Sequence, residues 1–95
     1  MTKEKTIIRE EFSTRFNKQL EQAPIEIKRA FLEVLHFFRD DPYHPALRNH
    51  ELKEKFAGYR SIDITEDWRV VFKEDNNGQK VIIFHLLGTH KQLYG

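Results

Sequence analysis

The sequence of 95 residues contains no cysteine. This absence excludes disulfide bonds, a thiolate nucleophile and cysteine-ligated zinc, and it is typical of a reducing cytosol. The four glycines are scattered at positions 58, 78, 88 and 95, so they form no phosphate-binding loop. No apolar run approaches the roughly 18 residues of a membrane-spanning helix, and the first five residues lack the apolar segment of a secretory signal. We therefore expect a cytoplasmic protein with no part in a membrane.

An excess of charge of either sign is also missing. Sixteen lysines and arginines stand against fifteen acidic residues, for a formal net charge of +1. This balance does not by itself indicate a nucleic-acid-binding protein. Aromatic residues, in contrast, are plentiful, with eight Phe, three Tyr and one Trp, which is too many for a disordered chain. The length leaves room for one core, so we expect a single domain over residues 1–95.

The spacing of apolar residues predicts two consecutive helices. Phe12, Phe16 and Leu20 share one face of a first helix over about 11–22. A second apolar stripe predicts a helix over about 24–41, which the following proline ends because the residue before a proline disfavours the α region. Each helix has one apolar face, so the pair must pack on another element.

Four segments have the composition of β-strands. They cover residues 5–9, 59–64, 68–72 and 81–87. Turns at 65–67 and 75–78 join the last three into an antiparallel meander, whose last strand is nearly all apolar and is therefore expected to be central. The order β-α-α-β-β-β predicts an α+β fold, with a helical hairpin packed on one face of an antiparallel sheet. The polar segment 43–58 is predicted to be an irregular functional loop.

Strand alternation separates the side chains of the meander into two faces. Val70 and Phe72 are predicted to face the helices, as are Ile62 and Ile64. Arg69 then faces the open side, next to Asp63 on the neighbouring strand. A cross-strand ion pair between these two residues and a phosphate-binding role for Arg69 are both open interpretations.

Three titratable side chains are candidates for acid–base chemistry. His50 lies in the polar loop, His90 follows the last predicted strand, and Asp67 lies in a turn. Two imidazoles and a carboxylate are sufficient for proton transfer without a metal. Each histidine has a plain alternative as a solvated loop residue. No histidine-rich or acidic metal-binding motif is present, so we expect neither a metal nor a cofactor. Trp68 and Tyr94 could stack on bases, with core packing as the alternative.

Several short motifs together resemble a known family. They are Asn49-His50-Glu51-Leu52-Lys53, Gly58-Tyr59-Arg60, Asp67-Trp68-Arg69, Gly88-Thr89-His90 and Leu93-Tyr94-Gly95. The chain resembles bacterial type II toxins of the RelE superfamily and is closest to the YafQ-like mRNA interferases. The resemblance covers nearly the whole chain, and it agrees with the predicted order of elements.

The resemblance implies a small ribonuclease that cuts mRNA in the ribosomal A site without a metal. The ribose 2′-OH attacks the adjacent phosphate, and the products carry a cyclic phosphate and a free 5′-OH. A cognate antitoxin is implied as partner, in a hetero-oligomeric complex that blocks the toxin. The family's active-site positions fall on His50, Asp67, Trp68 and His90, the C-terminal aromatic falls on Tyr94, and an arginine of the broader superfamily matches Arg69.

Cleavage needs a base, an acid and positive charge on the phosphorane. We expect His50 and His90 to form the acid–base pair, with either assignment open, and Asp67 to orient an imidazole or to act as base. Arg69 is the candidate cation. Further candidates for RNA contacts are Lys53, Lys55, Arg60, Trp68 and Tyr94.

The sequence departs from the YafQ pattern at two positions. Asp63 stands where YafQ has a second histidine, and Leu86 stands where YafQ has an arginine. Two alternatives therefore stay open: a non-enzymatic toxin of the ParE type that inhibits gyrase, and a folded but inactive relative. The joint presence of His50, Asp67 and His90 favours the ribonuclease.

Overall fold

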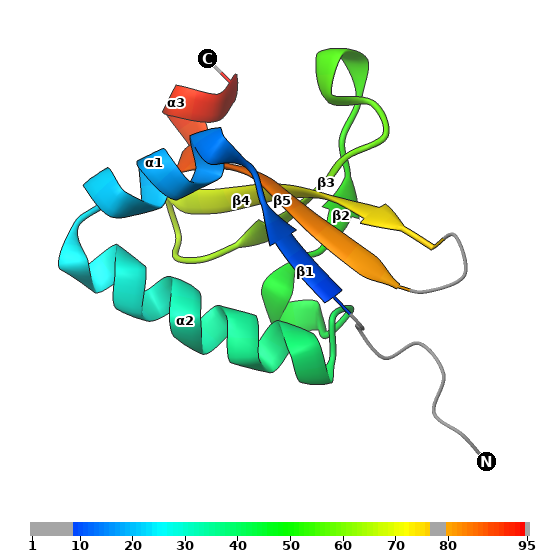
Figure 1. Cartoon of the computed structure of the whole chain (residues 1–95), viewed down its shortest axis with the longest axis horizontal. Coiled ribbons are helices and arrows are strands. Elements are labelled where there is room, and N and C mark those ends of the chain that lie inside the picture. The colour runs from blue at the N-terminus through cyan, green and yellow to red at the C-terminus, as the bar shows by residue number, and fades with distance from the viewer. Residues whose placement is uncertain (1–8, 77–79, 95) are drawn as a thin grey trace.

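The computed structural model describes residues 9–76 and 80–94. In this part of the chain a five-stranded sheet has the order β1-β5-β4-β3-β2 (Figure 1). The elements are β1 (Arg9–Phe12), α1 (Thr14–Gln22), α2 (Ile25–Asp40), η1 (Pro45–Leu47), β2 (His50–Glu51), η2 (Glu54–Phe56), β3 (Arg60–Asp63), β4 (Trp68–Asp75), β5 (Val81–Thr89) and α3 (His90–Tyr94). The predicted α+β class is confirmed, with both long helices between the first strand and the meander. No helix within 9–76 and 80–94 is long and apolar enough to cross a membrane.

The chain enters α1 later than predicted. Phe12 still belongs to β1, where its ring stacks on that of Phe84 with centroids 5.1 Å apart. Ser13 is the N-cap, because its Oγ accepts a hydrogen bond from the Phe16 N–H (2.9 Å). The predicted strand at 5–9 lies, except for Arg9, outside the described residues, as do positions 77 and 78 of the predicted turn at 75–78.

The sheet is mixed, whereas the sequence predicted an antiparallel one. The meander β3-β4-β5 is antiparallel as expected, but β1 pairs in parallel with β5. Parallel neighbours need a long crossover, and the two helices provide it. As predicted, β5 is not an edge strand, since it has β1 on one side and β4 on the other.

Beyond the end of β1, the start of α1 covers the edge of β5. The Ser13 N–H donates to the Phe84 carbonyl (2.9 Å), and Ser13 Oγ donates to the His85 carbonyl (2.8 Å). Farther along, the Leu87 N–H donates to Gln19 Oε1 (2.8 Å). These contacts satisfy backbone groups that would otherwise lack a partner in a buried strand.

The two faces of the sheet bury two separate clusters. The main core, on the face covered by α1 and α2 (the helix face), contains Phe16, Ala23, Ile27, Phe31, Leu35, Phe38, Leu47, Ile62, Ile64, Val70, Phe72, Ile82, Phe84 and Leu87. The opposite face (the outer face) carries the outer cluster, in which Val71, Leu86 and Leu93 are buried and Leu52, Phe56, Tyr59 and Tyr94 are partly buried. Strand alternation is thus confirmed. On this side of the sheet, α3 and the β2–β3 loop project from the strands at two separate places (Figure 1).

The short strand β2 and the helix α3 were not predicted. The segment 43–58, predicted to be an irregular loop, contains β2 and the two 3₁₀ turns η1 and η2, and the chain folds into α3 after β5. Gly88 allows α3 to pack closely on the sheet. A Cβ at this position would lie 3.1 Å from Gln92 Oε1 and 3.2 Å from Leu93 Cδ2. A larger residue would therefore push α3 away from β5.

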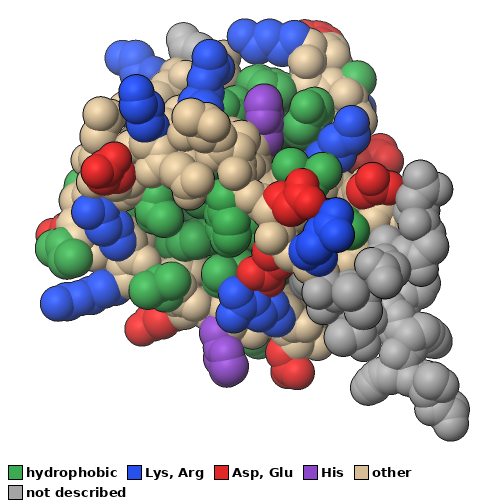
Figure 2. All heavy atoms as spheres, in the orientation of Figure 1, with side chains coloured by type: hydrophobic (Ala, Val, Ile, Leu, Met, Phe, Trp, Pro, Cys, Tyr) green, Lys and Arg blue, Asp and Glu red, His purple; other side chains and the backbone are tan. Residues whose placement is uncertain are grey.

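A groove of about 350 Å³ lies between α1 and α2. Leu20, Phe31 and Leu32 line it together with Asn17, Glu21 and Lys28. Figure 2 shows apolar side chains gathered on this face of the molecule. The two helices therefore leave apolar surface exposed outside the main core, most of all at Leu32.

Phe84 connects the elements of the main core and gives a first prediction. Its side chain is fully buried, and its ring contacts those of Phe12, Phe16, Phe31, Phe38 and Phe72. We expect Phe84→Ala to reduce the free energy of unfolding by about 3–5 kcal/mol, because it leaves a cavity that neighbours cannot fill. Urea unfolding measures this loss. The matched control is Phe37→Ala, whose ring is 38% exposed; an equal loss in both variants would contradict the prediction.

Candidate active site

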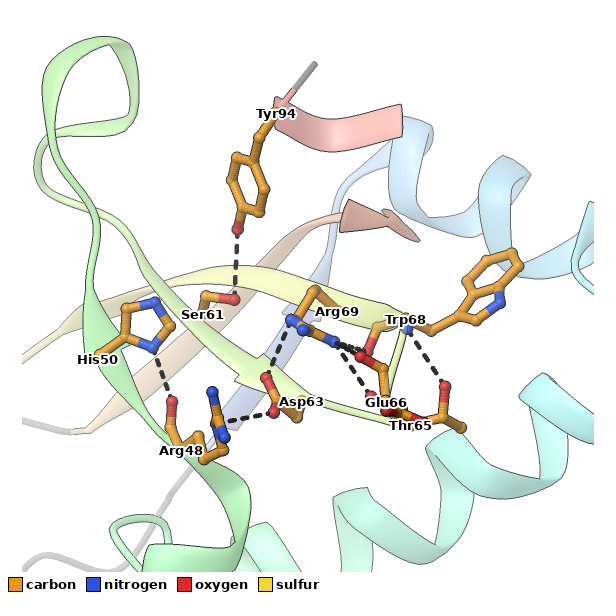
Figure 3. Close-up of polar contacts among 9 residues, drawn as sticks. All are labelled: Arg48, His50, Ser61, Asp63, Thr65, Glu66, Trp68, Arg69 and Tyr94. Atoms are coloured by element: carbon orange, nitrogen blue, oxygen red, sulfur yellow. Dashed lines mark hydrogen bonds and ion pairs between the residues drawn. The ribbon is translucent and has the colours of Figure 1, made fainter. Parts of the chain in front are cut away.

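A carboxylate between two arginines marks the outer face of the sheet (Figure 3). The register of β3 and β4 places Asp63 opposite Arg69. Asp63 Oδ1 lies 3.1 Å from Arg69 Nε, and Asp63 Oδ2 lies 3.1 Å from Arg48 Nε. The cross-strand ion pair that the sequence left open is therefore present. Asp63 also forms an ion pair with Arg48, from the segment before β2. The sequence did not indicate this second ion pair.

Arg69 is bound to its own surroundings. Its side chain is 15% exposed, and its Nη1 donates to the carbonyls of Thr65 (3.1 Å), Glu66 (2.8 Å) and Trp68 (3.3 Å). The Trp68 N–H in turn donates to Thr65 Oγ1 (3.2 Å). Arg69 thus holds the turn 65–67 in place. Because these contacts occupy its guanidinium, Arg69 is better suited to position the turn than to bind a phosphate. Its side chain lies on the outer face, as predicted.

The same turn holds the start of α3. The Asp67 carbonyl accepts a hydrogen bond from the His90 N–H (2.9 Å), one of the donors that a helix start leaves without a partner. Both side chains are exposed. The His90 ring lies against the ring of Tyr94, with centroids 4.9 Å apart. The structure therefore brings the backbone of Asp67 and that of His90 together.

His50 has a defined orientation and a defined tautomer. It belongs to β2, and its Nδ1 lies 2.7 Å from the Arg48 carbonyl oxygen. A carbonyl only accepts hydrogen bonds, so Nδ1 carries the proton and Nε2 is left to accept or donate one. The backbone of Arg48 is left-handed, with φ of 53°, and this conformation directs its carbonyl toward the imidazole (Figure 3).

Tyr94 and Ser61 connect the two histidines. The Tyr94 hydroxyl donates to Ser61 Oγ (3.3 Å), and Ser61 is the cross-strand partner of His50. Directly opposite residues of an antiparallel pair share a face, so His50 lies on the outer face with Ser61. His90 touches Tyr94 at the other end of this series. Both candidate histidines thus lie on the same side of the sheet.

Two predicted RNA contacts lie on the helix face. Trp68 packs partly against the main core, which was the alternative reading of this residue. Arg60 pairs with the core residue Phe72, its Nε donates to Asn49 Oδ1 (2.7 Å), and its guanidinium lies over the Tyr43 ring at 5.3 Å. Alternation places both on the side away from His50, so neither belongs to the candidate site.

Other predicted residues surround the outer face. Lys53 and Lys55 are exposed in the β2–β3 loop. Leu86 is buried in the outer cluster, opposite Val71, so the position at which YafQ-like toxins have an arginine lies here within an apolar surface. Among residues 9–76 and 80–94, no group of three or more metal-ligating side chains is close enough to bind a metal ion.

Arg48 and Ser61 are site residues that the motifs did not identify. Arg48 stands only two positions before His50, but its role depends on a left-handed backbone that its residue type does not indicate. Ser61 is buried and was recognisable only as an alternating polar position. Their places in the site can be recognised only from the structure, in which Ser61 pairs with His50 across β2 and β3 and Arg48 contacts both Asp63 and His50.

Known structures share this fold. YafQ from E. coli is 23% identical, with a TM-score of 0.69 over 90% of this chain and 97% of that one. The YoeB/ParE toxin from Agrobacterium tumefaciens is 16% identical, with a TM-score of 0.73 over 87% and 99%. The E. coli DinJ-YafQ complex gives 24% identity and a TM-score of 0.67 over 90% and 97%. A comparison with curated protein sequences found no match.

At these identities the solved structures establish the fold alone. The model of a protein family, described as the bacterial toxin YafQ of type II toxin-antitoxin systems, matches residues 8–95. This match spans both helices, the whole sheet and every candidate site residue, and it confirms the resemblance seen in the motifs. The chain therefore belongs to the YafQ family of bacterial toxins of type II toxin-antitoxin systems.

Proposed function

We propose that this toxin is a ribosome-dependent endoribonuclease that cleaves translated mRNA by acid–base chemistry without a metal. The observation that carries the proposal is the placement of two exposed imidazoles on one face of the sheet, His50 with its Nδ1 proton held by a carbonyl and His90 with its N–H bound to the Asp67 turn. Fixing Nδ1 leaves Nε2 of His50 as the single position for proton exchange with a substrate. A catalytic imidazole needs this arrangement.

The proton balance of the cleavage assigns a task to each imidazole. The 2′-oxygen forms a bond to phosphorus and loses its proton to one imidazole. The bond from phosphorus to the 5′-oxygen breaks, and that oxygen takes a proton from the other imidazole. The products are a 2′,3′-cyclic phosphate and a free 5′-OH. The proposal leaves open which histidine is the base, and Asp67 acts through its turn as orienter of His90 or as a base itself.

Arg48 is the best-supported source of positive charge for the phosphate. Its side chain is 73% exposed and is held through Nε by Asp63, which leaves the outer nitrogens of its guanidinium directed to the solvent side. Its own carbonyl holds His50, so cation and imidazole are mutually positioned. Arg69, in contrast, uses Nε and Nη1 for contacts within the chain. We therefore assign the phosphate contact to Arg48 and a positioning role to Arg69.

We further propose a cognate antitoxin as the physiological partner, since the family consists of toxins of type II toxin-antitoxin systems and one similar structure is a DinJ-YafQ complex. The ribosome would supply much of the substrate affinity, which agrees with the net charge of only +1. A gyrase-directed toxin of the ParE type is the second candidate, favoured by the structural similarity to a YoeB/ParE toxin.

The first functional prediction concerns the target. Expression of the chain in bacteria is expected to stop growth and to shorten translated mRNAs, which primer extension detects. The control is the double variant His50→Gln/His90→Gln, which should permit growth. Continued translation together with gyrase trapped on cleaved DNA would contradict the ribonuclease function and support a gyrase-directed toxin of the ParE type.

The second prediction concerns the two imidazoles. Single-turnover cleavage on programmed ribosomes should show a bell-shaped pH dependence, because one imidazole must be neutral and the other protonated. His50→Ala and His90→Ala should each lower the rate by about 10²–10⁴-fold and flatten one limb. The double variant should be little worse than the poorer single one, since the two act as a unit.

The control for this series is His36→Ala, an exposed histidine on α2 that should leave the rate unchanged. The product is expected to carry a cyclic phosphate. A 3′-OH product, or full activity in both single variants, would contradict the two-imidazole mechanism and leave Asp67 as the remaining candidate.

The third prediction separates the two arginines. Arg48→Asn should lower the cleavage rate by about 100-fold, as loss of one donor to a developing oxyanion does. Asparagine tolerates the left-handed backbone, so the carbonyl that holds His50 is retained, and loss of an exposed ion pair should cost at most about 1 kcal/mol. Arg69→Ala should lower both rate and melting temperature, because it removes four contacts around the turn. Full activity of Arg48→Asn would contradict the assignment of the phosphate contact to Arg48 and leave Arg69 as the candidate cation.

A further inference from the structure

A continuous series of aromatic rings crosses the outer face, starting at His90. The Tyr94 ring, which touches His90, has its centroid 5.9 Å from that of Phe56. Phe56 lies 6.5 Å from Tyr59, and Tyr59 lies 4.8 Å from the His85 ring at an interplanar angle of 31°. We name Tyr94, Phe56, Tyr59 and His85 the aromatic track.

These rings differ from the aromatic residues of the main core. All four members of the track are half-buried, whereas Phe16, Phe38, Phe72 and Phe84 of the main core are fully buried. The track therefore keeps part of its π surface in contact with solvent. Packing on the buried outer cluster explains the inner edges of Tyr94, Phe56 and Tyr59, but it does not explain the part of the track that stays exposed.

Basic side chains accompany the track along its length. Lys55 Nζ lies 5.7 Å from the centroid of Phe56, and Lys73 Nζ lies 5.6 Å from that of Tyr59. At the far end, burial and then the positive charge of Arg15 hold the pKa of His85 below its ordinary value, so this ring is a neutral stacking surface near neutral pH. Lysines on flexible stems can leave a ring and follow a phosphate without breaking the fold.

We propose that the aromatic track is a stacking subsite for unpaired bases of the RNA strand on one side of the cleaved phosphate. The proposal rests on the ribonuclease function above, because the track begins at His90 and leads away from it. Half-exposed rings interleaved with mobile cations are what single-stranded nucleic acid needs: rings take the base faces and amines take the phosphates. Binding of this kind tolerates any base, so the track holds the strand and leaves sequence choice elsewhere.

The test is direct binding of a short RNA. The probe is a single-stranded hexaribonucleotide with 2-aminopurine at one position and a 2′-deoxyribose at the third nucleotide, which prevents cleavage at the central phosphate. Stacking on a ring quenches 2-aminopurine fluorescence. We expect quenching for probes labelled on one side of the centre only, and we expect Tyr59→Leu to raise the Kd by about 10-fold, as loss of one stacked base does. Tyr59→Phe should bind like the parent chain.

The chain offers a matched control. Tyr43 is an exposed tyrosine with an arginine over its ring, but it lies with Arg60 on the helix face. Tyr43→Leu should therefore leave the Kd unchanged, and its melting temperature shows what the same truncation does to stability alone. Lys73→Gln should reduce the dependence of log Kd on log salt by about 0.7, the value for one phosphate contact to a single strand.

Ribosomal cleavage by the unaltered chain is measured in parallel. If the chain cleaves mRNA but Tyr59→Leu binds the hexamer as tightly as Tyr43→Leu does, the track is only packing and the inference is overturned. If the chain binds the hexamer through Tyr59 but cleaves no mRNA, the proposed function fails, and the track is a base-stacking RNA surface with no cleaved phosphate beside it. Equal quenching on both sides of the centre would also contradict a one-sided track.

Discussion

The fold depends on β5 burying both of its faces at once. Its Ile82 and Phe84 contribute to the main core, and Leu86 contributes to the outer cluster. Counted from Phe84, strict alternation would instead place Leu86 on the helix face and Leu87 on the outer face. A shift in register opposite Val71 and Phe72 inserts His85 as an extra residue, so that Leu87 returns to the main core. The same insertion turns His85 and Leu86 onto the outer face together.

The candidate site is assembled from segments that separate interactions hold in place. Arg69 binds the turn that carries Asp67, and that turn binds the first residue of α3. The left-handed Arg48 orients His50 at the opposite edge, and Asp63 joins the two arginines. One carboxylate faces two guanidinium groups, so the network keeps an excess of one positive charge, and the exposed Arg48 is the member best able to change partners.

The spacing of apolar residues along the sequence predicted those features that depend on the periodicity of helices and strands. The apolar stripe of α2, the meander and the faces of β3 and β4 follow from spacings of 3.6 and 2, and they are confirmed. Phe12 of the predicted first stripe lies in β1 instead, and the register shift interrupts the alternation of β5. The side of Arg60 was also readable, because it stands two positions before Ile62. Other features depend on distant partners: the parallel pairing of β1, the late start of α1 and the helix α3 all require β5 to be in place. The carbonyl of Arg48 could not be predicted, since a positive φ is unusual for arginine.

The parallel pairing of β1 with β5 has a consequence for how the chain folds. The hydrogen bond from Ser13 to the His85 carbonyl spans 72 positions, and every partner of β1 in the sheet lies on β5. Contacts of such long range form slowly, since loop closure precedes any gain. During synthesis, Phe12 and Phe16 leave the ribosome long before Phe84, and they stay without their core partners until β5 follows. A chain built in this way cannot complete its outer face early, so the candidate site forms only once almost all of the described chain has been made.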